Sequence, residues 1–294
     1  MIILPTFEAL GTKWLIEIFD DLGKEESQIT YEGLALFIKK FDDRYSHFKH
    51  KSIINNLSDS GFLLEPDQMT IDLLEYGLNL YHQTNGVFNF LSENTLSMGG
   101  YNAIYSSSPI DNSVNIPDPT QVLTISKEKI LLVKGQIDIG GYGKGYLIDL
   151  VAKELKDTYQ IKEFIINGGG DMYATTQKGR PVKIYLEHPT VQNLMIAETT
   201  LCNEGFAASS TSTRQSETDS RIHSQIIDPK TGESHNNALG VFIKAPTAAV
   251  ADAWATTLLI STPDHHLPSL EKLAIKVTTY SEQEKNFREW GSFF

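Results

Sequence analysis

A glycine-rich segment with one lysine is the part of the sequence best suited to binding an anion. It reads DIGGYGKGY over residues 138–146 and leads directly into the amphipathic run LIDLVAKELKDTY. Glycines let backbone N–H groups approach an anion closely, and a helix start adds unpaired donors and a partial positive charge. Lys144 adds a full charge, so the segment suits a pyrophosphate. The spacing matches neither the Walker loop nor the dinucleotide fingerprint, and the glycines alone are equally consistent with a structural turn.

A second segment places one acid in an otherwise apolar helix. It reads TAAVADAWATTLLI over residues 247–260, and Asp252 and Thr256 share a face because they are four residues apart. A carboxylate, a hydroxyl and a nearby loop carbonyl are oxygen ligands suited to Mg²⁺, which keeps other positions for water and substrate phosphate. The alternative is that Asp252 caps a neighbouring helix or pairs with a lysine.

Two further segments end in turn residues. The run FIINGGGD over 164–171 is a buried strand followed by glycines and an acid. It indicates either a tight strand exit or close approach of the backbone to a ligand. Three successive glycines cost much chain entropy on folding, which favours the second alternative. The run IIDPKTG over 226–232 is a strand ending in an Asp-Pro turn closed by glycine, which alone predicts only a turn.

The surrounding pattern predicts the elements that must position these segments. The N-terminal segment begins with a strand. Helices are expected at about 26–45 and 67–84, the second capped by Asp67, and both should pack against a sheet. A long loop is expected at about 91–120, followed by a hairpin in which residues 123–126 and 130–133 pair. The expected apolar face of the second helix consists of Ile71, Leu74, Leu78 and Tyr81.

Length and composition favour one globular α+β unit. The chain has 294 residues, of which 40% are hydrophobic, which is enough for a sizeable shared core. Strands mix with helices without a strict β-α alternation, so we expect an α+β fold rather than a doubly wound parallel sheet.

Several classes of protein are excluded or disfavoured. The net charge is −12 and the basic residues are scattered, so no nucleic-acid partner is expected. The single Cys202 excludes an intrachain disulfide, has no thiolate partner for a zinc cluster or redox pair, and is expected to be a small buried or half-buried residue. No stretch approaches the roughly 20 apolar residues of a transmembrane helix. Since the N-terminal segment shows no basic leader, cleavage site or lipobox, we expect a cytoplasmic protein.

Six motifs, taken in order, resemble those of the ApbE-like FAD:protein FMN transferases. The likeness spans nearly the whole chain, and the closing REWGSFF is also similar. No single motif is specific, but their shared order and spacing make coincidence improbable. The motifs are LGT (10–12), GVFN (86–89), DIGGYGKGY (138–146), FIINGGGD (164–171), IIDPKTG (226–232) and ADAWATT (251–257).

The resemblance implies both a fold and a reaction. It implies a single ApbE-like domain over 1–294, with two intimately joined lobes, mixed or antiparallel sheets, and FAD in the cleft between them. The implied reaction is Mg²⁺-dependent transfer of FMN from FAD to a threonine or serine hydroxyl of an acceptor flavoprotein, with release of AMP. The implied metal ligands are the Asp252 carboxylate, the Thr256 hydroxyl and the Gly141 carbonyl, and Ala255 stands where some relatives have an acid. The implied FAD contacts are Leu10, Phe48, Val87, Phe88, Asn89, Asp138, Lys144 and Ile227.

Three positions depart from the family pattern. Leu10 replaces the usual Met, which conserves volume, and Asn89 replaces an Asp, which exchanges a charged acceptor for a neutral amide. Gln225 stands where relatives place a His, and an amide cannot act as a general base at neutral pH. His223 lies two residues earlier and faces the same side if the segment is a strand. It is therefore a candidate base for the acceptor hydroxyl, the alternative being an ordinary surface histidine.

Two other functions are consistent with the same motifs. The first is a Mg²⁺-dependent FAD pyrophosphatase, which releases FMN and AMP to water. The second is a non-catalytic FAD-binding protein. Retention of the two implied side-chain ligands, Asp252 and Thr256, argues against the second, since a carrier has little need of a metal at the pyrophosphate.

Overall fold

A computed structural model gives the fold of the chain. It describes residues 1–92, 117–176, 180–210, 240–281 and 286–294.

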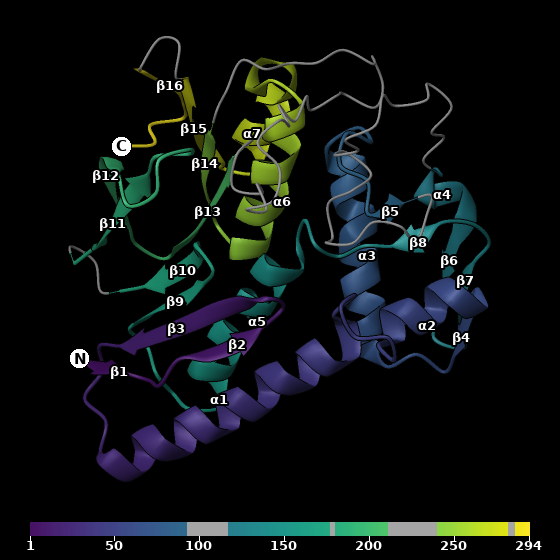
Figure 1. The fold of residues 1–294 in the computed structure, drawn as a ribbon, viewed down its shortest axis with the longest axis horizontal. Coiled ribbons are helices and arrows are strands. Elements are labelled where there is room, and N and C mark those ends of the chain that lie inside the picture. Colours follow the sequence, from purple (N-terminus) through teal and green to yellow (C-terminus); the bar gives the residue numbers. More distant parts are fainter. Residues whose placement is uncertain (93–116, 177–179, 211–239, 282–285) are drawn as a thin grey trace.

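A nine-stranded antiparallel sheet is the largest element of the described fold (Figure 1). It consists of β1 (Ile2–Ile3), β2 (Phe7–Ala9), β3 (Thr12–Ile18), β9 (Phe164–Gly168), β10 (Asp171–Thr175), β13 (Glu204–Ser210), β14 (Gly240–Ala245), β15 (Lys276–Ser281) and β16 (Asn286–Trp290). The strand order is β1-β3-β9-β10-β13-β14-β15-β16, with β2 paired to β3. Since all these neighbours run antiparallel, the expected α+β class is confirmed.

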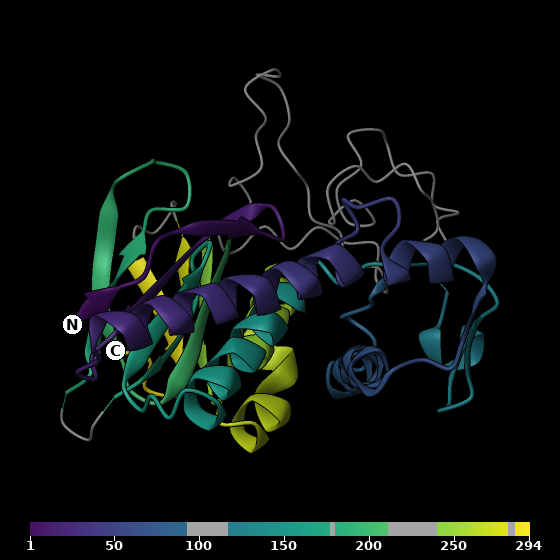
Figure 2. The ribbon, with the colours of Figure 1, turned by 90° about the horizontal axis from the view of Figure 1, so that it is seen from below.

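The described helices pack on this sheet or form a second region beside it. They are α1 (Lys24–Tyr45), α2 (Ile53–Ser60), α3 (Gln68–Gln83), α4 (Pro119–Val122), α5 (Gly143–Asp157), α6 (Ala248–Ile260), the short 3₁₀ helix η1 (Pro263–His266) and α7 (Leu267–Lys272). Figures 1 and 2 show α1 running from the large sheet to the region of α2 and α3.

Three small antiparallel sheets complete the described structure. They are β4 (Phe62–Leu64), β7 (Lys129–Leu132) and β6 (Leu123–Ile125); β5 (Leu91–Ser92) and β8 (Gln136–Ile137); and β11 (Val182–Glu187) and β12 (Met195–Leu201). The β6–β7 hairpin confirms the pairing expected around residues 123–133.

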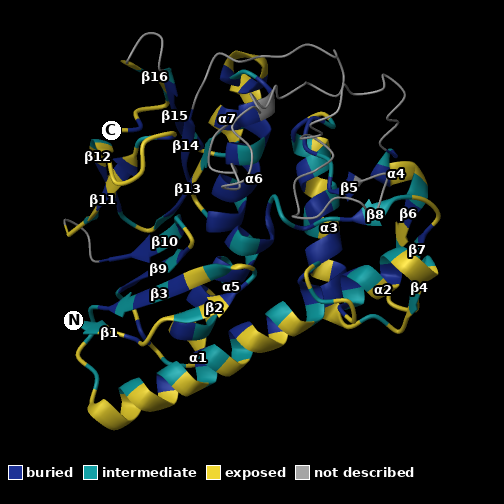
Figure 3. Ribbon diagram, in the orientation of Figure 1, coloured by how far each residue is buried: buried dark blue, intermediate teal, exposed yellow. Residues whose placement is uncertain are grey.

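The two faces of the large sheet are covered differently. Val241 and Ile243 of β14 pack with Trp254 of α6 on one face. Phe242, which points the other way, packs with Leu186 of the β11–β12 hairpin. The sheet therefore lies between a helical layer and a hairpin, and α6, apolar on nearly all sides, is almost wholly buried (Figure 3). A separate core cluster joins β3, α1, α5 and the region of α2 and α3.

The structure confirms both expected early helices and shortens the expected loop. Asp67 caps α3 by accepting a hydrogen bond from the Thr70 N–H. The buried face of α3 is centred on Leu73, Leu74 and Leu80, while Leu78 and Tyr81 lie at its edges. α1 contacts β2 and α3 contacts β6, as expected of helices packed on sheets.

The loop expected at 91–120 was too long at both ends. Residues 91–92 form β5, which pairs with β8 more than 40 residues later, a contact without a local sequence signal. At the other end, Asp118 accepts a hydrogen bond from the Thr120 N–H and so caps α4, whose first residue is Pro119. Residues 93–116 lie outside the described part of the chain. No helix among the described residues is long and apolar enough to cross a membrane.

The start of α6 is fixed by a carboxylate from α5. Asp149 accepts hydrogen bonds from the N–H groups of Ala248 and Ala249, each at 2.9 Å. Thr247, the preceding residue, accepts one from the Val250 N–H. Three of the four N–H groups that a helix start leaves unpaired are thereby satisfied, and α6 is anchored on α5.

Replacing Asp149 by alanine should lower the free energy of unfolding by roughly 2 kcal/mol, because two buried N–H groups lose their acceptor. Chemical denaturation measured by circular dichroism would show this. Asp157→Ala, at the exposed end of the same helix, is the matched control and should leave the unfolding midpoint unchanged. Equal midpoints for the wild type and Asp149→Ala would contradict this role.

Candidate functional site

The glycine-rich segment forms a turn and the first residues of α5. The Asp138 carboxylate accepts a hydrogen bond from the Gly140 N–H at 2.8 Å, which closes the turn. Tyr142 is fully buried and its hydroxyl donates to the Leu73 carbonyl of α3 at 3.1 Å. α5 then begins at Gly143, so the expected glycine-rich loop opening a helix is confirmed.

Asp252 lies against the beginning of α5. Its Oδ2 accepts a hydrogen bond from the Gly145 N–H at 3.0 Å, and its carboxylate is 3% exposed. This contact requires a glycine, since a Cβ built on Gly145 would lie 2.4 Å from the carbonyl oxygen of Ala248. Asp252 also lies 3.4 Å from Lys144 Nζ. The structure thus shows both the helix capping and the lysine pairing that the sequence left as alternatives to a metal role.

Asp171 is a site residue that sequence reasoning did not assign. Its Oδ2 lies 2.6 Å from Lys144 Nζ, closer than either oxygen of Asp252. Burial, with a smaller contribution from the Asp252 carboxylate, raises the pKa of Asp171 to about 7, although the Lys144 ammonium acts to lower it. In the sequence, the acid at the end of the FIINGGGD motif is the feature that could have identified Asp171 as a site residue. A single lysine therefore lies between two buried carboxylates that come from β10 and α6.

The GVFN motif packs against the same group of residues. Val87 lies in the core cluster that contains residues of α6, and the rings of Phe88 and Tyr142 form a T-shaped contact. A Cβ built on Gly141 would lie 3.0 Å from the Phe88 ring and 3.7 Å from the Thr256 methyl group. Gly141 and Thr256, two of the three expected metal ligands, are therefore neighbours, and Asp252 lies one turn before Thr256 on the same helix face.

Asn89 has a local role that explains the departure from aspartate. Its amide Nδ2 donates to the Pro117 carbonyl at 3.0 Å, and its Oδ1 accepts from the Leu91 N–H at 2.9 Å. A carboxylate cannot make the first of these contacts, because it has no hydrogen to donate. The Asn89 side chain thus holds the backbone of Leu91 close to that of Pro117.

The last two glycines of FIINGGGD form the hairpin turn between β9 and β10, and Gly168 ends β9. Gly169 and Gly170 have φ values of +73° and +100°, as in the two-residue turns that favour glycine. A Cβ on Gly169 would lie 2.2 Å from the Thr12 hydroxyl, so the LGT motif packs directly on this turn. The structure shows the tight strand exit, one of the two alternatives that the sequence left open, and the approach of this backbone to a ligand stays a prediction.

Leu10 and Phe48 lie together at the other side of the LGT motif. A Cβ built on Gly11 would lie 3.2 Å from the Phe48 ring, which places Phe48 against the turn that carries Leu10. Leu10 is half-buried, whereas Phe48 is 58% exposed. The expected residues His223, Gln225 and Ile227 lie outside the described part of the chain.

Five of the six motifs thus meet in one contiguous region, although residues 10 and 256 lie far apart in the sequence. The sequence profile of the ApbE family matches residues 10–279. The chain belongs to the ApbE family. The family resemblance inferred from the sequence is confirmed.

Curated relatives and solved structures agree with this assignment. A protein of Escherichia coli strain K12 named FAD:protein FMN transferase is 23% identical over 97% of this chain and 86% of its own length. A protein of the same name from Vibrio cholerae is 22% identical over 96% and 88%. The ApbE protein from Thermotoga maritima has a TM-score of 0.76 at 18% identity, covering 97% of this chain and 95% of that one. The flavin transferase ApbE from Vibrio cholerae has a TM-score of 0.73 at 19% identity, covering 98% and 96%. At these identities the solved structures establish the ApbE fold.

The donor atoms present fit a magnesium ion that is shared with a phosphate. Among the described residues, no three His, Cys, Asp or Glu side chains gather into a metal site. The expected set is sparser, with one carboxylate, one hydroxyl and one carbonyl, as is usual for Mg²⁺, which keeps waters and substrate phosphates. Asp252 suits this role because one backbone N–H and a lysine at 3.4 Å leave further lone pairs of its carboxylate available.

Proposed function

We propose that this protein is a Mg²⁺-dependent FAD:protein FMN transferase. It moves FMN from FAD onto a threonine or serine hydroxyl of an acceptor flavoprotein and releases AMP. The curated relatives carry the name FAD:protein FMN transferase, and on this likeness the chain is an enzyme, a flavin transferase.

The observation that carries the proposal is the convergence of five motifs around Lys144. Lys144 stands in the first turn of α5, where the partial positive charge of the helix dipole adds to its own. Asp171 holds the ammonium at 2.6 Å, and Gly141 and Thr256 lie nearby. This combination of a cation, a helix start and hard oxygen ligands matches the needs of a pyrophosphate with a bound Mg²⁺.

The roles of the residues follow from this arrangement. Asp252, Thr256 and the Gly141 carbonyl would hold Mg²⁺, which when bound neutralises charge on the pyrophosphate. Lys144, with the positive end of the α5 dipole behind it, binds the same pyrophosphate. Val87 and Phe88, the proposed FAD contacts beside it, are buried and support the site from within the core. Leu10 and Phe48 across the LGT turn contribute apolar surface that suits the rings of FAD. The remaining proposed FAD contacts are Asp138, Asn89 and Ile227. Asp138 and Asn89 act through the turns that they stabilise.

The transfer itself needs a base near the acceptor. The acceptor hydroxyl oxygen forms a bond to the FMN phosphorus, the bond from that phosphorus to the AMP oxygen breaks, and AMP leaves with the electron pair. His223 is the proposed acceptor of the hydroxyl proton, because Gln225 cannot take it. The acceptor's identity and the expected cytoplasmic location remain predictions.

Two incubations test the proposal. The purified protein is given FAD and MgCl₂, first alone and then with the acceptor protein of one of the named relatives, while AMP and covalently bound flavin are measured. Transfer predicts slow AMP release alone, and equal amounts of AMP and covalent flavin with the acceptor. Rapid AMP release without an acceptor would instead support the FAD pyrophosphatase. FAD binding without turnover in either incubation would support the non-catalytic protein.

A further inference from the structure

The turn between β2 and β3 holds a leucine in an unfavourable backbone conformation. Leu10 has a φ of +50° and Gly11 a φ of +71°. Two-residue hairpin turns with both φ values positive favour asparagine or aspartate followed by glycine, and the left-handed region is disfavoured for a side chain such as leucine. Such a residue persists only where its surroundings hold it, and this is common at ligand sites.

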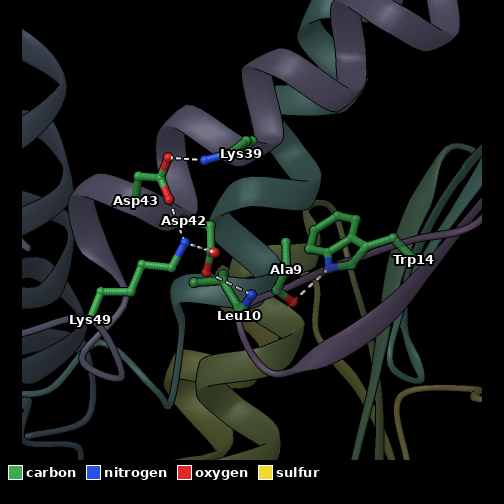
Figure 4. A network of polar contacts seen from close by, with 7 residues as sticks. All are labelled: Ala9, Leu10, Trp14, Lys39, Asp42, Asp43 and Lys49. Carbon is green, nitrogen blue, oxygen red and sulfur yellow. Dashed lines mark hydrogen bonds and ion pairs between the residues drawn. The ribbon is translucent and has the colours of Figure 1, made fainter.

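The residue that holds Leu10 is Asp42, in the last turn of α1. Its Oδ1 accepts a hydrogen bond from the Leu10 N–H at 2.9 Å, and Figure 4 shows the carboxylate lying between this N–H and Lys49. The second oxygen, Oδ2, lies 2.5 Å from Lys49 Nζ, and the Asp42 side chain is only 14% exposed. Asp43 also pairs with Lys49, but it is more exposed and none of its contacts in Figure 4 reaches the turn.

Lys49 belongs to the short segment that carries Phe48. The Asn55 amide at the start of α2 fixes this segment from the other side, since it donates to the carbonyls of His47 and Lys49. The His47 ring lies 3.9 Å from the Phe48 ring, between centroids. Asp42 therefore links the backbone of Leu10 directly to the segment that presents Phe48.

This link places the exposed Phe48 ring over the turn that carries Leu10. Phe48 is 58% exposed and Leu10 is half-buried, and the Phe48 ring lies over Gly11. Trp14, whose indole N–H donates to the Ala9 carbonyl, anchors the strand side of the same turn. Polar contacts thus hold both the turn and the Phe48 segment in place, and the exposed ring can stack on a planar partner.

We infer that Asp42 is a positioning residue, which presets Leu10 and Phe48 as a rigid apolar wall for one of the two planar ring systems of FAD. The inference rests on the proposed function, because FAD must be the ligand. Preorganisation of this kind raises affinity by lowering the cost of ordering the wall on binding. The affinity lost when Asp42 is replaced is confined to the ring that contacts the wall. The pyrophosphate of FAD is bound as in the wild type.

The test measures the two halves of FAD separately. FMN binding is followed by flavin fluorescence, and ADP binding in the presence of MgCl₂ by titration calorimetry. Asp42→Ala should weaken one of these ligands at least tenfold and change the other by less than about twofold, and the ligand that weakens identifies the ring. Asp42→Asn keeps an acceptor for the Leu10 N–H and should recover most of the loss. Asp43→Ala, which removes a neighbouring carboxylate beside Lys49, is the matched control and should change neither affinity.

The outcomes separate this inference from the proposed function. If Asp42→Ala binds both ligands as the wild type does, or weakens both equally, the positioning role is wrong while the proposed function stands. If the wild type binds neither half of FAD, the proposed function fails and the inference fails with it. Thermal unfolding checks that Asp42→Ala is folded. Should it not fold, Lys49→Met, which removes the pairing of Asp42 with the Phe48 segment, must weaken one of the two ligands severalfold and leave the other unchanged. Unchanged binding of both ligands would overturn the role.

Discussion

Replacing Lys144 by methionine should lower the free energy of unfolding by about 3 kcal/mol, because the change leaves two buried carboxylates without their shared cation. Asp171 and Asp252 are 5% and 3% exposed, and the ammonium lies 2.6 Å from the first and 3.4 Å from the second. Urea unfolding followed by tryptophan fluorescence measures the loss. Binding of FAD should fall as well, since the pyrophosphate loses its closest proposed charge.

A second change in the same background tests this explanation. Asp171→Asn removes one of the stranded carboxylates, so the double variant should regain most of the stability that Lys144→Met loses.

The loss in free energy of unfolding caused by Lys144→Met alone should also grow as the pH rises above 7. Burial already raises the pKa of Asp171 to about 7, and loss of the lysine raises it further. The folded variant therefore holds a proton that the unfolded chain has released, and stability falls as the pH rises towards the folded pKa. A deficit that does not depend on pH and is not relieved by Asp171→Asn would show that lost packing is the cause.

Replacing Asp252 by asparagine should abolish the enhancement of FAD binding by Mg²⁺ and slow FMN transfer about a hundredfold or more. Asparagine is close in shape and its oxygen still accepts the Gly145 N–H, so the helix contact survives while the charged metal ligand is lost. A bound metal supplies several kcal/mol of transition-state stabilisation, which at 1.36 kcal/mol per tenfold in rate corresponds to this loss. Calorimetric titration of FAD with and without MgCl₂ measures the first effect and needs no acceptor.

The matched control for this prediction is Asp264→Asn. Asp264 lies just beyond α6 and accepts a hydrogen bond from the Trp290 indole at 2.9 Å, outside the proposed site. It should leave the Mg²⁺ effect unchanged. If Asp252→Asn binds FAD as tightly as the wild type in the presence of Mg²⁺, Asp252 has only the capping and pairing roles seen in its contacts, and the proposed metal site is wrong.

Elements whose signals are local were predicted well from the sequence. The helix expected at 67–84 begins after Asp67 because that side chain accepts a nearby N–H group. The glycine-rich segment was expected to open a helix, and α5 begins within it at Gly143. The loop at 91–120 was less well predicted at its first end, because β5 pairs with a strand that the chain reaches only later.

The polar contacts of the site could not be predicted in the same way. Asp252 was identified as the important acid of its helix, but its distance to Lys144 depends on how α5 packs on α6, which Gly145 permits. No sequence pattern distinguished Asp42 as a residue that holds another element, since a carboxylate near the end of a helix is ordinarily a solvated surface group. Asn89 was identified as an exchange of a charged acceptor for a neutral amide, but only the structure shows that this amide is bonded to the backbone of Leu91 and Pro117.

The family, the order of the motifs and the ends of many elements could be inferred from the sequence, because these depend on residues that interact within a few positions of one another. The position of Lys144 between Asp171 and Asp252, and the contact by which Asp42 holds Leu10, became clear from the folded chain alone. Those contacts join residues from 27 to 108 positions apart, by the numbering of their partners. Their distances are set by the packing of α5, α6 and the sheet, in which each element is fixed by many apolar contacts that no single motif encodes.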